Sequence, residues 1–240
     1  EIANATGIMT INDFRSEDVS KGGQGAPLVP IGDRHLFADY PICLNIGGIA
    51  NVSYEMNGKR IAYDICMANQ LLNYLANKLG YDYDKNGQFA KRGNINKVLF
   101  EILNDNDYYK HDAPKSLGRE FFENVQHKVI DESSLPVYDL LATATEHIAY
   151  QIAKSVDVLD KSKMLVTGGG AKNDFLIERI CALSKHEIIV PDVMITDYKE
   201  ALIFAFLGVL KMEGKINVLS SVTGASSDSS SGKIYQIENQ

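Results

Sequence analysis

The stretch ICLNIGGIANVSYEMNGKRIAYD, residues 42–64, decides the fold class of this chain. It contains three consecutive β-rich runs, which we expect to be strands at 42–46, 50–55 and 60–64. Gly47-Gly48 joins the first two, and Asn57-Gly58, a strong hairpin signal, joins the second and third. Further strands are predicted at 164–167 and 187–190, where apolar runs alternate with helical patterns. A strand meander followed by such alternation predicts an α/β domain with a mixed sheet flanked by helices.

Apolar residues at helical spacing predict the helices, which we expect at 68–79, 95–103, 119–130, 137–159, 173–183 and 199–212. Residues 8–12 predict one more strand, and the glycine-rich stretch 21–30 predicts a loop. The Ser/Asp-rich segment 226–231 predicts a mobile loop or a frayed turn. Residues 1–7 do not look like a natural start, because they lack a Met and a helical pattern runs directly into a strand. We therefore expect that an upstream region is missing.

The composition is that of a globular protein with one large domain or two small ones. The chain has 240 residues, of which 45% are hydrophobic and 23% charged, and its formal net charge is −7. The absence of a basic stripe argues against a nucleic-acid partner. No apolar run reaches the roughly 18 residues of a membrane span, and no signal peptide opens the chain. Three cysteines without CxxC spacing indicate neither a zinc site nor a disulfide framework, so we expect a cytoplasmic protein.

The first candidate site is the Gly47-Gly48 turn between β-rich runs. Successive backbone N–H groups in such a turn can converge on a phosphate, because glycine has no Cβ to hinder a close approach. A simple tight hairpin explains the same pattern and is the more common use of two glycines. Both interpretations stay open from the residues alone.

The second candidate is LVTGGGAKN, residues 165–173, in which an apolar strand leads into three glycines and an Asn-initiated helix. A helix N-terminus behind a flexible turn can hold a nucleotide, because its dipole favours anions. The glycines are consecutive, so the pattern is neither GxGxxG nor a GxxxxGK[ST] loop, and a dinucleotide fold is disfavoured. Nucleotide binding and a structural turn remain equally good explanations.

The third candidate is the acidic and glycine-rich stretch 12–30, NDFRSEDVSKGGQGAPLVP. A carboxylate beside a flexible loop that tolerates anions would suit a general base near a transferring phosphoryl group. The common alternative is a solvated run of charges before a loop. A fourth segment, DYDKNG at 82–87, begins like a calcium-binding loop, but the twelfth position is Gly93 and supplies no carboxylate, so we reject calcium there.

Together these segments are similar to one family, the anhydro-N-acetylmuramic acid kinases. The similarity covers nearly the whole chain in order, through DFRSEDVSKGGQGAPLVP, NIGGIAN, APKSLGREFF, ATATEHIA, TGGGAKN, the Glu-Ala of 200–201 and VTGA. GGQGAPLVP followed closely by NIGGIAN is a specific signature, far stronger than either part alone.

The resemblance implies the two-lobed sugar-kinase/heat-shock/actin fold, an actin-like ATPase (ribonuclease H-like) fold with MgATP in its cleft. Residues 1–40 would be the tail of the N-terminal lobe, and 41–240 the C-terminal nucleotide-binding lobe. The implied reaction hydrolyses the 1,6-anhydro ring of anhydro-N-acetylmuramic acid and phosphorylates O6, giving N-acetylmuramic acid 6-phosphate in peptidoglycan recycling. The implied partner is this small-molecule substrate, and a homodimer is the expected assembly.

The resemblance also implies roles for individual residues. The nucleotide would be held by Asn45, Gly47 and Gly48 in a second phosphate loop and by Gly168, Gly169, Gly170 and Asn173 in an adenosine loop. Asp18 is the expected base that activates water for attack at the anomeric carbon, and Asp13 is the alternative. The sugar side would be lined by Gln24, Gly25 and Glu200.

The chain departs from the family pattern in three places. The glycine-rich loop of the first lobe has no match, so the chain alone is expected to lack half of the cleft and to be inactive. The segment 64–69, DICMAN, replaces a form with Gly and Pro, and Leu117 stands where Thr is usual. Two rival functions therefore stay open: a non-catalytic nucleotide-binding module of the same fold, and another small-molecule kinase.

Overall fold

The structure is a computed structural model that describes residues 1–236, and it divides into two compact units. Unit 1 contains Glu1–Ala38, Glu55–Ala62 and the chain from Tyr198 onward, and unit 2 contains Asp39–Tyr54 and Tyr63–Asp197. The predicted lobe boundary near residue 40 stays a prediction. The structure adds that the C-terminal segment belongs to the same unit as the first 38 residues.

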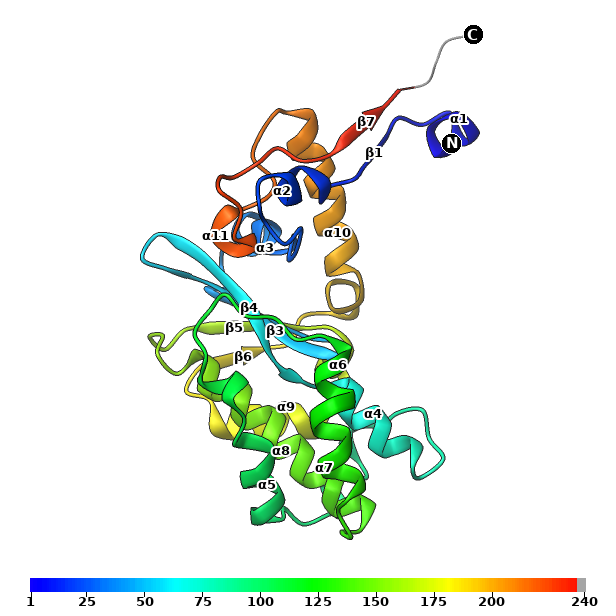
Figure 1. The fold of residues 1–240 in the computed structure, drawn as a ribbon, viewed down its shortest axis with the longest axis vertical. Coiled ribbons are helices and arrows are strands. Elements are labelled where there is room, and N and C mark those ends of the chain that lie inside the picture. The colour runs from blue at the N-terminus through cyan, green and yellow to red at the C-terminus, as the bar shows by residue number, and fades with distance from the viewer. Residues whose placement is uncertain (237–240) are drawn as a thin grey trace. The chain divides into compact units, whose positions relative to one another are not determined.

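Unit 2 is built on a five-stranded mixed sheet (Figure 1). Its strands are β2 (Ile42–Ile46), β3 (Ile49–Met56), β4 (Lys59–Met67), β5 (Lys163–Thr167) and β6 (Glu187–Ile189), in the order β4-β3-β2-β5-β6. β2 pairs antiparallel with β3 and parallel with β5, and β5 pairs parallel with β6. The predicted mixed sheet is confirmed, and this strand order is that of the ribonuclease H-like fold that the resemblance implied.

The central strand is hydrophobic except at Asn45, and it lies between two other strands. Leu44 and Ile46 of β2 are completely buried, as are Met164 and Val166 of β5. The hairpin signal at Asn57-Gly58 is also confirmed, since both residues have positive φ in the turn between β3 and β4.

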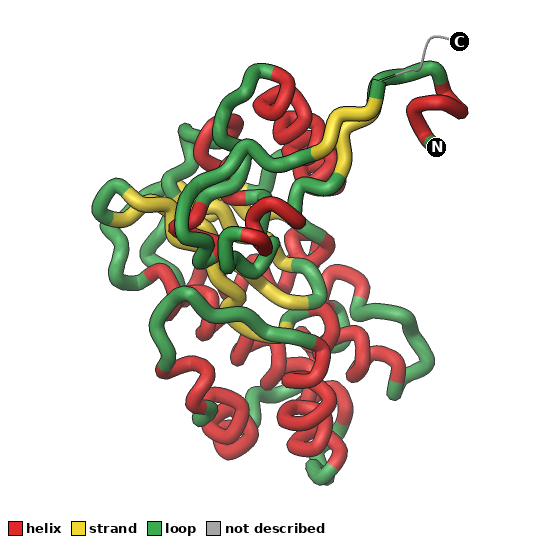
Figure 2. Tube along the Cα trace, turned by 45° about the horizontal axis from the view of Figure 1, so that its top comes forward, coloured by secondary structure: helices red, strands yellow, loops and turns green. Residues whose placement is uncertain are grey.

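The helices of unit 2 lie together on one side of its sheet (Figures 1 and 2). They are α4 (Asn69–Asn77), α5 (Lys97–Asn104), α6 (Arg119–Phe121), a π-helical turn (Phe122–Gln126), α7 (His127–Asp131), α8 (Val137–Val156) and α9 (Asp174–Leu183). Short 3₁₀ turns lie at Lys85–Gly87, Ala90–Arg92, Asp107–Lys110 and Gly169–Lys172. α8 packs against α4, α5 and α9, and its apolar stripe, including Leu141, Ile148 and Ile152, is fully buried.

Unit 1 contains short elements and one long helix. They are α1 (Ile2–Thr6), β1 (Thr10–Asn12), α2 (Ser16–Ser20), α3 (Pro30–Leu36), α11 (Ser220–Thr223), β7 (Lys233–Tyr235) and α10 (Val193–Met212), whose first turns belong to unit 2. β1 and β7 form a two-stranded antiparallel sheet. α2 and α3 flank the predicted loop and were not expected, and α10 begins six residues before its predicted start at 199.

A cluster of buried charges ties unit 1 together. Nζ of Lys199 on α10 lies 2.7 Å from Oδ1 of Asp33 on α3, and Nη2 of Arg60 on β4 lies 3.8 Å from the other oxygen of that carboxylate. All three side chains are almost fully buried. Because a buried charge needs opposite charge beside it, the cluster specifies how α3, α10 and the tip of the β3–β4 hairpin pack.

The prediction of a mobile loop at 226–231 is wrong for the end of that segment. Ser229 and Ser231 are buried, and their hydroxyl oxygens lie 2.8 Å apart. The amide of buried Asn217 donates to the carbonyl of Ser231 and accepts from the backbone N–H of the same residue. Serine is small enough to be buried when its polar atoms are paired, and the composition of the segment did not reveal these partners.

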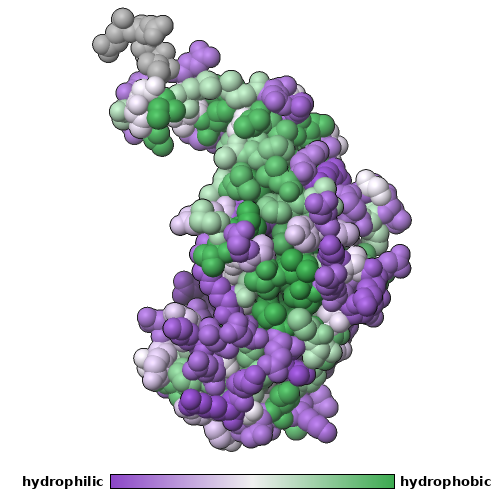
Figure 3. All heavy atoms as spheres, turned by 180° about the vertical axis from the view of Figure 1, so that it is seen from behind, coloured by the Kyte–Doolittle hydropathy of each residue, from purple (hydrophilic) through white to green (hydrophobic). Residues whose placement is uncertain are grey.

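The surface also carries apolar side chains. On α10, Tyr198, Leu202, Val209 and Met212 are exposed along one side of the helix, and Figure 3 shows that hydrophobic surface is extensive on the face it views. Within residues 1–236 the structure has no helix that combines the length and the hydropathy of a membrane span.

Candidate functional site

The two glycine turns of unit 2 meet at one edge of its sheet. β2 and β5 are parallel neighbours in which Asn45 pairs with Thr167, so Gly47-Gly48 and Gly168–Gly170 leave the sheet side by side. Ligands of open α/β sheets bind outside the carboxyl ends of the strands, where two such loops diverge. The structure thus brings together all seven residues for which the resemblance implied nucleotide contacts.

The triple-glycine turn has no room for a side chain at two of its three positions. Gly168 has φ +85°, and a Cβ on it would stand 2.6 Å from Oδ1 of Asn45 and 2.8 Å from the carbonyl oxygen of Ile46. A Cβ on Gly170 would stand 2.2 Å from Cγ2 of Ile46. Gly169 is different, because its nearest neighbour, Nδ2 of Asn69, would be at 3.5 Å. The turn is therefore pressed against β2 at its two ends and open at its middle glycine.

The Gly47-Gly48 turn is a tight hairpin between β2 and β3, and its carbonyl groups also bind the start of α4. The carbonyl of Gly48 accepts hydrogen bonds from the backbone N–H groups of Ala68 and Gln70, and that of Gly47 accepts from Asn69. These are first N–H groups of α4, which have no partner inside their own helix. The turn therefore fixes the start of α4 beside the site.

Two asparagine side chains hold the elements that leave this edge. Oδ1 of Asn173 accepts from the backbone N–H of Leu176 at 3.0 Å and caps α9. Nδ2 of Asn69 donates to the carbonyl of Ile46 at 3.2 Å. The predicted helix after the triple-glycine turn is thus confirmed, with Asn173 as its N-cap and its first helical residue one position later than predicted, at Asp174.

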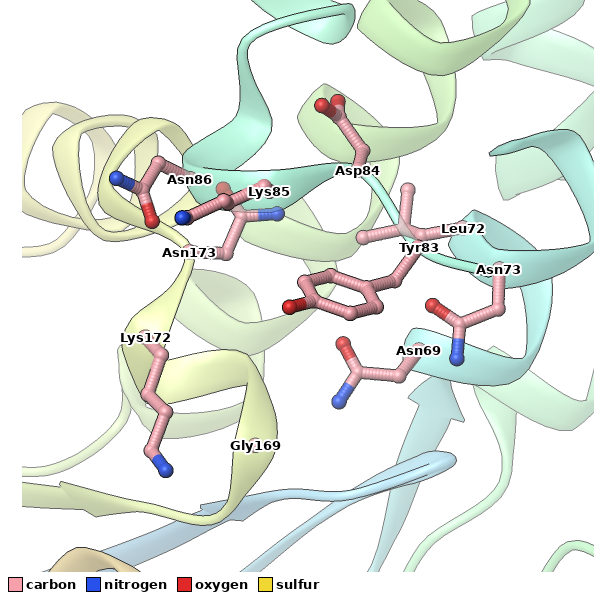
Figure 4. Close-up of a pocket in the computed structure, with 10 residues that line it drawn as sticks. All are labelled: Asn69, Leu72, Asn73, Tyr83, Asp84, Lys85, Asn86, Gly169, Lys172 and Asn173. Atoms are coloured by element: carbon pink, nitrogen blue, oxygen red, sulfur yellow. The ribbon is translucent and has the colours of Figure 1, made fainter. Parts of the chain in front are cut away.

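A pocket of about 460 Å³ opens between α4, the triple-glycine turn and the loop after α4 (Figure 4). Its lining is rich in amides and amines and consists of Asn69, Leu72, Asn73, Tyr83, Asp84, Lys85, Asn86, Gly169, Lys172 and Asn173. Nζ of Lys172 lies 2.6 Å from Oδ1 of Asp197. The side chain of Asp84 points away from the pocket centre, because its oxygens accept from the backbone N–H groups of Phe89 and Ala90.

Of the ten lining residues, only Gly169 and Asn173 were predicted as nucleotide contacts, and the residues at 83–86 form the largest continuous stretch that sequence reasoning missed. They belong to the DYDKNG segment, which was weighed only as a calcium site. Nothing in the spacing of that segment shows that it folds back onto the triple-glycine turn.

In unit 1 the structure places Asp18 at the centre of a buried network. The side chain is completely buried, Oδ2 accepts from the backbone N–H of Gly25 at 2.8 Å, and Oδ1 accepts from the hydroxyl of Thr223 at 2.6 Å. A Cβ on Gly23 would stand 2.2 Å from Oδ2 of Asp18. The glycine-rich loop is therefore wrapped around one carboxylate, and this is the reason for the glycine at position 23.

Asp13 has a different environment. Its φ is +57°, its carboxylate accepts from the hydroxyl of Ser16, and Nζ of Lys233 lies 2.7 Å from Oδ2. The hydrogen bonds from Lys233 and then Ser16 lower the pKa of Asp13 to about 2. A carboxylate that holds its proton so weakly is a poor general base near neutral pH.

Of the residues expected on the sugar side, Gln24 and Gly25 lie beside Asp18 and Thr223. Gly25 donates to Asp18, as described, and its carbonyl accepts from Nη1 of Arg15 at 2.6 Å. The exposed Gln24 donates its backbone N–H to the carbonyl of Thr223. Glu200 is exposed on α10. Thr223 was missed as a site residue, although it lies in the VTGA stretch, because its partner Asp18 is 205 residues away.

Two of the three departures from the family pattern, the segment 64–69 and Leu117, lie next to each other in unit 2. Oδ2 of Asp64 accepts from the backbone N–H of Leu117 at 2.9 Å, and burial raises the pKa of Asp64. The Leu117 side chain is buried, so the apolar residue fits its surroundings.

The residues of unit 2 suit a nucleotide. The close approach of glycine backbone, the amide-rich pocket and the Lys172 ammonium are features that bind a phosphate chain and a nucleoside. Within the part of the chain that the structure describes, no group of three His, Cys, Asp or Glu side chains could hold a metal ion.

Comparisons with known proteins show the family to which the chain belongs. A sequence model of the anhydro-N-acetylmuramic acid kinase family matches residues 1–237. The anhydro-N-acetylmuramic acid kinase of Vibrio cholerae is 38% identical over 98% of this chain and 66% of its own length, and that of Actinobacillus pleuropneumoniae serotype 3 is 37% identical over 98% and 67%. The chain thus spans about two thirds of the length of these relatives. Among solved structures, the activator of the 2-hydroxyisocaproyl-CoA dehydratase from Clostridium difficile with bound ADPNP aligns with 78% of this chain and 66% of its own, at 19% identity and a TM-score of 0.49.

Proposed function

Because the chain belongs to the anhydro-N-acetylmuramic acid kinase family, we propose that it binds ATP in unit 2 and acts in the phosphorylation of anhydro-N-acetylmuramic acid. The observation that carries the proposal is the meeting of both glycine turns at the carboxyl ends of β2 and β5. The Gly47-Gly48 and Gly168–Gly170 turns would lie along the phosphates, and Asn173 would lie on the nucleoside side.

The reaction we propose couples ring opening to phosphoryl transfer. The carboxylate of Asp18 takes a proton from a water molecule, whose oxygen forms a bond to the anomeric carbon C1 of the sugar. The bond from C1 to O6 breaks, O6 takes up the γ-phosphoryl group of ATP, and ADP leaves. The product is N-acetylmuramic acid 6-phosphate. Mg²⁺, when bound, would neutralise charge on the phosphates, and we expect the phosphates and water to be most of its ligands.

Asp18 suits the role of base better than Asp13 does. Each carboxylate oxygen of Asp18 accepts one hydrogen bond in the structure, and a carboxylate has about four acceptor positions, so about two positions remain for further hydrogen bonds, although the side chain is completely buried in this structure. Its two donors hold it in one orientation, as a general base requires. Asp13 is instead paired with Lys233. Gln24, Gly25 and Glu200 are proposed to contact the sugar.

Asp18→Asn tests this role with little change of shape. The Asn side chain can still accept from Gly25, and the Thr223 hydroxyl can turn to accept from its amide, so we expect the variant to fold. In a protein of the full length of these relatives that contains this chain, turnover is expected to fall at least about 100-fold, while the affinity for ATP stays nearly unchanged. Asp13→Asn is the matched comparison, and it should retain turnover. Wild-type turnover in Asp18→Asn would refute the assignment.

The product mass separates this function from its rivals. A protein of the full length of these relatives that contains this chain is incubated with MgATP and 1,6-anhydro-N-acetylmuramic acid, and the mass of the product is measured by mass spectrometry. A gain of one phosphoryl group plus one water supports the coupled reaction. A gain of the phosphoryl group alone assigns an ordinary kinase, and ATP binding without any product assigns a non-catalytic nucleotide-binding module.

We make two further proposals, one on the cellular role of the protein and one on its assembly. We propose that the protein acts in the cytoplasm, in the recycling of peptidoglycan, and that it forms a homodimer. Light scattering on the purified protein tests the second, and a monomer at all concentrations would contradict it.

A further inference from the structure

The loop after α4 has no role in the function proposed so far, yet it supplies four of the ten residues that line the pocket, at 83–86. It is held internally by Asp84, whose two oxygens accept from the backbone N–H groups of Phe89 and Ala90, each at 2.9 Å. It is tied to α4 by Nδ2 of Asn77, which donates to the carbonyl of Tyr81 at 2.7 Å. Hydrogen bonds within the loop and to α4 therefore hold it in a defined conformation at the side of the pocket.

The same loop is pressed against the element that follows the triple-glycine turn. Gly87 has φ +69°, and a Cβ on it would stand 2.4 Å from Oδ1 of Asn173 and 2.5 Å from Cβ of Phe175. Only glycine allows the loop to come this close to the start of α9. Since Asn173 caps α9 directly after the turn, this contact fixes the distance between the loop and the triple-glycine turn.

Tyr83 is the side chain that this arrangement presents to the pocket. Its ring lies in the middle of the lining residues, with the hydroxyl directed toward Lys172 and Asn173 and away from Asn73 (Figure 4). The residue is 58% exposed, although it is a large aromatic side chain. Within residues 1–236 no ring–ring contact involves Tyr83, whereas its neighbour Tyr81 lies with its ring centroid 4.9 Å from that of Phe89.

An exposed aromatic face beside amide side chains is the surface that a nucleobase needs. Every base has a π-face that stacks on an aromatic ring, and the amides of Asn73 and Asn86 each offer a donor and an acceptor for its edge. The Asp84 carboxylate is turned away, so it does not repel phosphates in the pocket.

We propose that Tyr83 is the stacking platform for the base of the bound nucleotide, and hence that the lining segment at 83–86 determines nucleotide affinity and base preference. The inference rests on the proposed ATP site of unit 2. It assigns the base to the side of the pocket formed by this loop and the phosphates to the side formed by the glycine turns.

Isothermal titration calorimetry of the full chain tests the inference with two ligands, MgATP and inorganic tripolyphosphate. Tyr83→Ala is expected to bind ATP roughly 5- to 150-fold more weakly, the loss that follows when one base loses its aromatic partner. Its affinity for tripolyphosphate should equal that of the wild type, because no base is present. Tyr83→Phe keeps the ring and should restore most of the ATP affinity.

Tyr81→Ala is the matched control, because it removes an equally exposed tyrosine two residues away that lies outside the pocket lining. It should bind ATP as the wild type does. Unchanged ATP binding by Tyr83→Ala would overturn the inference and leave the proposed function standing. Equal weakening toward both ligands would also overturn it, because the residue would then act through the shape of the loop. Failure of the wild type to bind ATP would instead refute the nucleotide site itself.

Discussion

Lowering the pH from 7 to 5 is expected to destabilise unit 2, because His147 on α8 is completely buried as a neutral ring. Nδ1 of His147 lies 2.9 Å from Oδ1 of Asn104, which also accepts from Nε2 of Gln151. An amide oxygen can only accept, so Nδ1 carries the ring proton, and Nε2 accepts from the Tyr109 hydroxyl at 3.3 Å.

The size of the effect follows from the pKa of this ring. Burial lowers the pKa of His147 to about 3, whereas the unfolded chain has the ordinary value of 6.5. Below pH 6.5 the unfolded chain therefore binds a proton that the folded chain does not, and stability falls as the pH falls. At about 1.4 kcal/mol per pH unit, the free energy of unfolding should drop by about 2 kcal/mol between pH 7 and pH 5. Above pH 6.5 the stability is fully present, and near pH 3 the loss levels off.

Urea denaturation at pH 7, 6 and 5 measures this loss. The chain contains no Trp, so far-ultraviolet circular dichroism is the suitable signal. His147→Gln keeps a polar side chain that does not titrate, and it serves as the reference. Burial raises the pKa of Asp64, which works in the opposite direction, and the reference variant subtracts that contribution. Equal pH slopes in the two proteins would refute the conclusion that His147 stays neutral in the fold.

Three further substitutions test the packing. Gly168→Ala places a Cβ at φ +85° and 2.8 Å from the carbonyl oxygen of Ile46, so we expect the free energy of unfolding to fall by roughly 1–3 kcal/mol in urea denaturation. In Gly169→Ala the new Cβ lies 3.5 Å from Nδ2 of Asn69, an ordinary van der Waals contact, so the free energy of unfolding should be unchanged. The affinity for ATP, measured by calorimetry, should fall. Equal stability of Gly168→Ala and Gly169→Ala would contradict this geometry. Lys199→Met leaves buried Asp33 without its 2.7 Å partner and should lower stability by about 3 kcal/mol in the same urea assay, and an unchanged value would contradict the ion pair.

Local elements could be predicted from the sequence because their causes are local. β2 has the predicted bounds, 42–46, since a short apolar run between Pro and Gly-Gly leaves little choice. The Asn57-Gly58 turn follows from two residues that accept positive φ. The helix at 119–130 was only partly foreseen, because its middle is the π-helical turn Phe122–Gln126, for which the apolar spacing gives no sign.

The candidate site likewise contains residues that could be predicted from the sequence and residues that could not. The glycines of both turns were found because glycine marks positions where backbone must pass close to something. Thr223 and Tyr83 were missed, because a Thr in a VTGA stretch and a Tyr in a polar loop are ordinary residues until their neighbours are known. The exposed position of Glu200, by contrast, leaves its expected role a prediction.

The sequence by itself determined the family, the mixed sheet and the turns, since periodicity, turn residues and motif order are all properties of neighbouring positions. Only the tertiary structure decided which carboxylate is enclosed by the GGQG loop, which loop faces the triple-glycine turn, and which histidine is held neutral. The physical reason is that burial and hydrogen bonding depend on groups brought from far along the chain. Asp18 and Thr223 illustrate it, because neither shows its partner until the chain has folded.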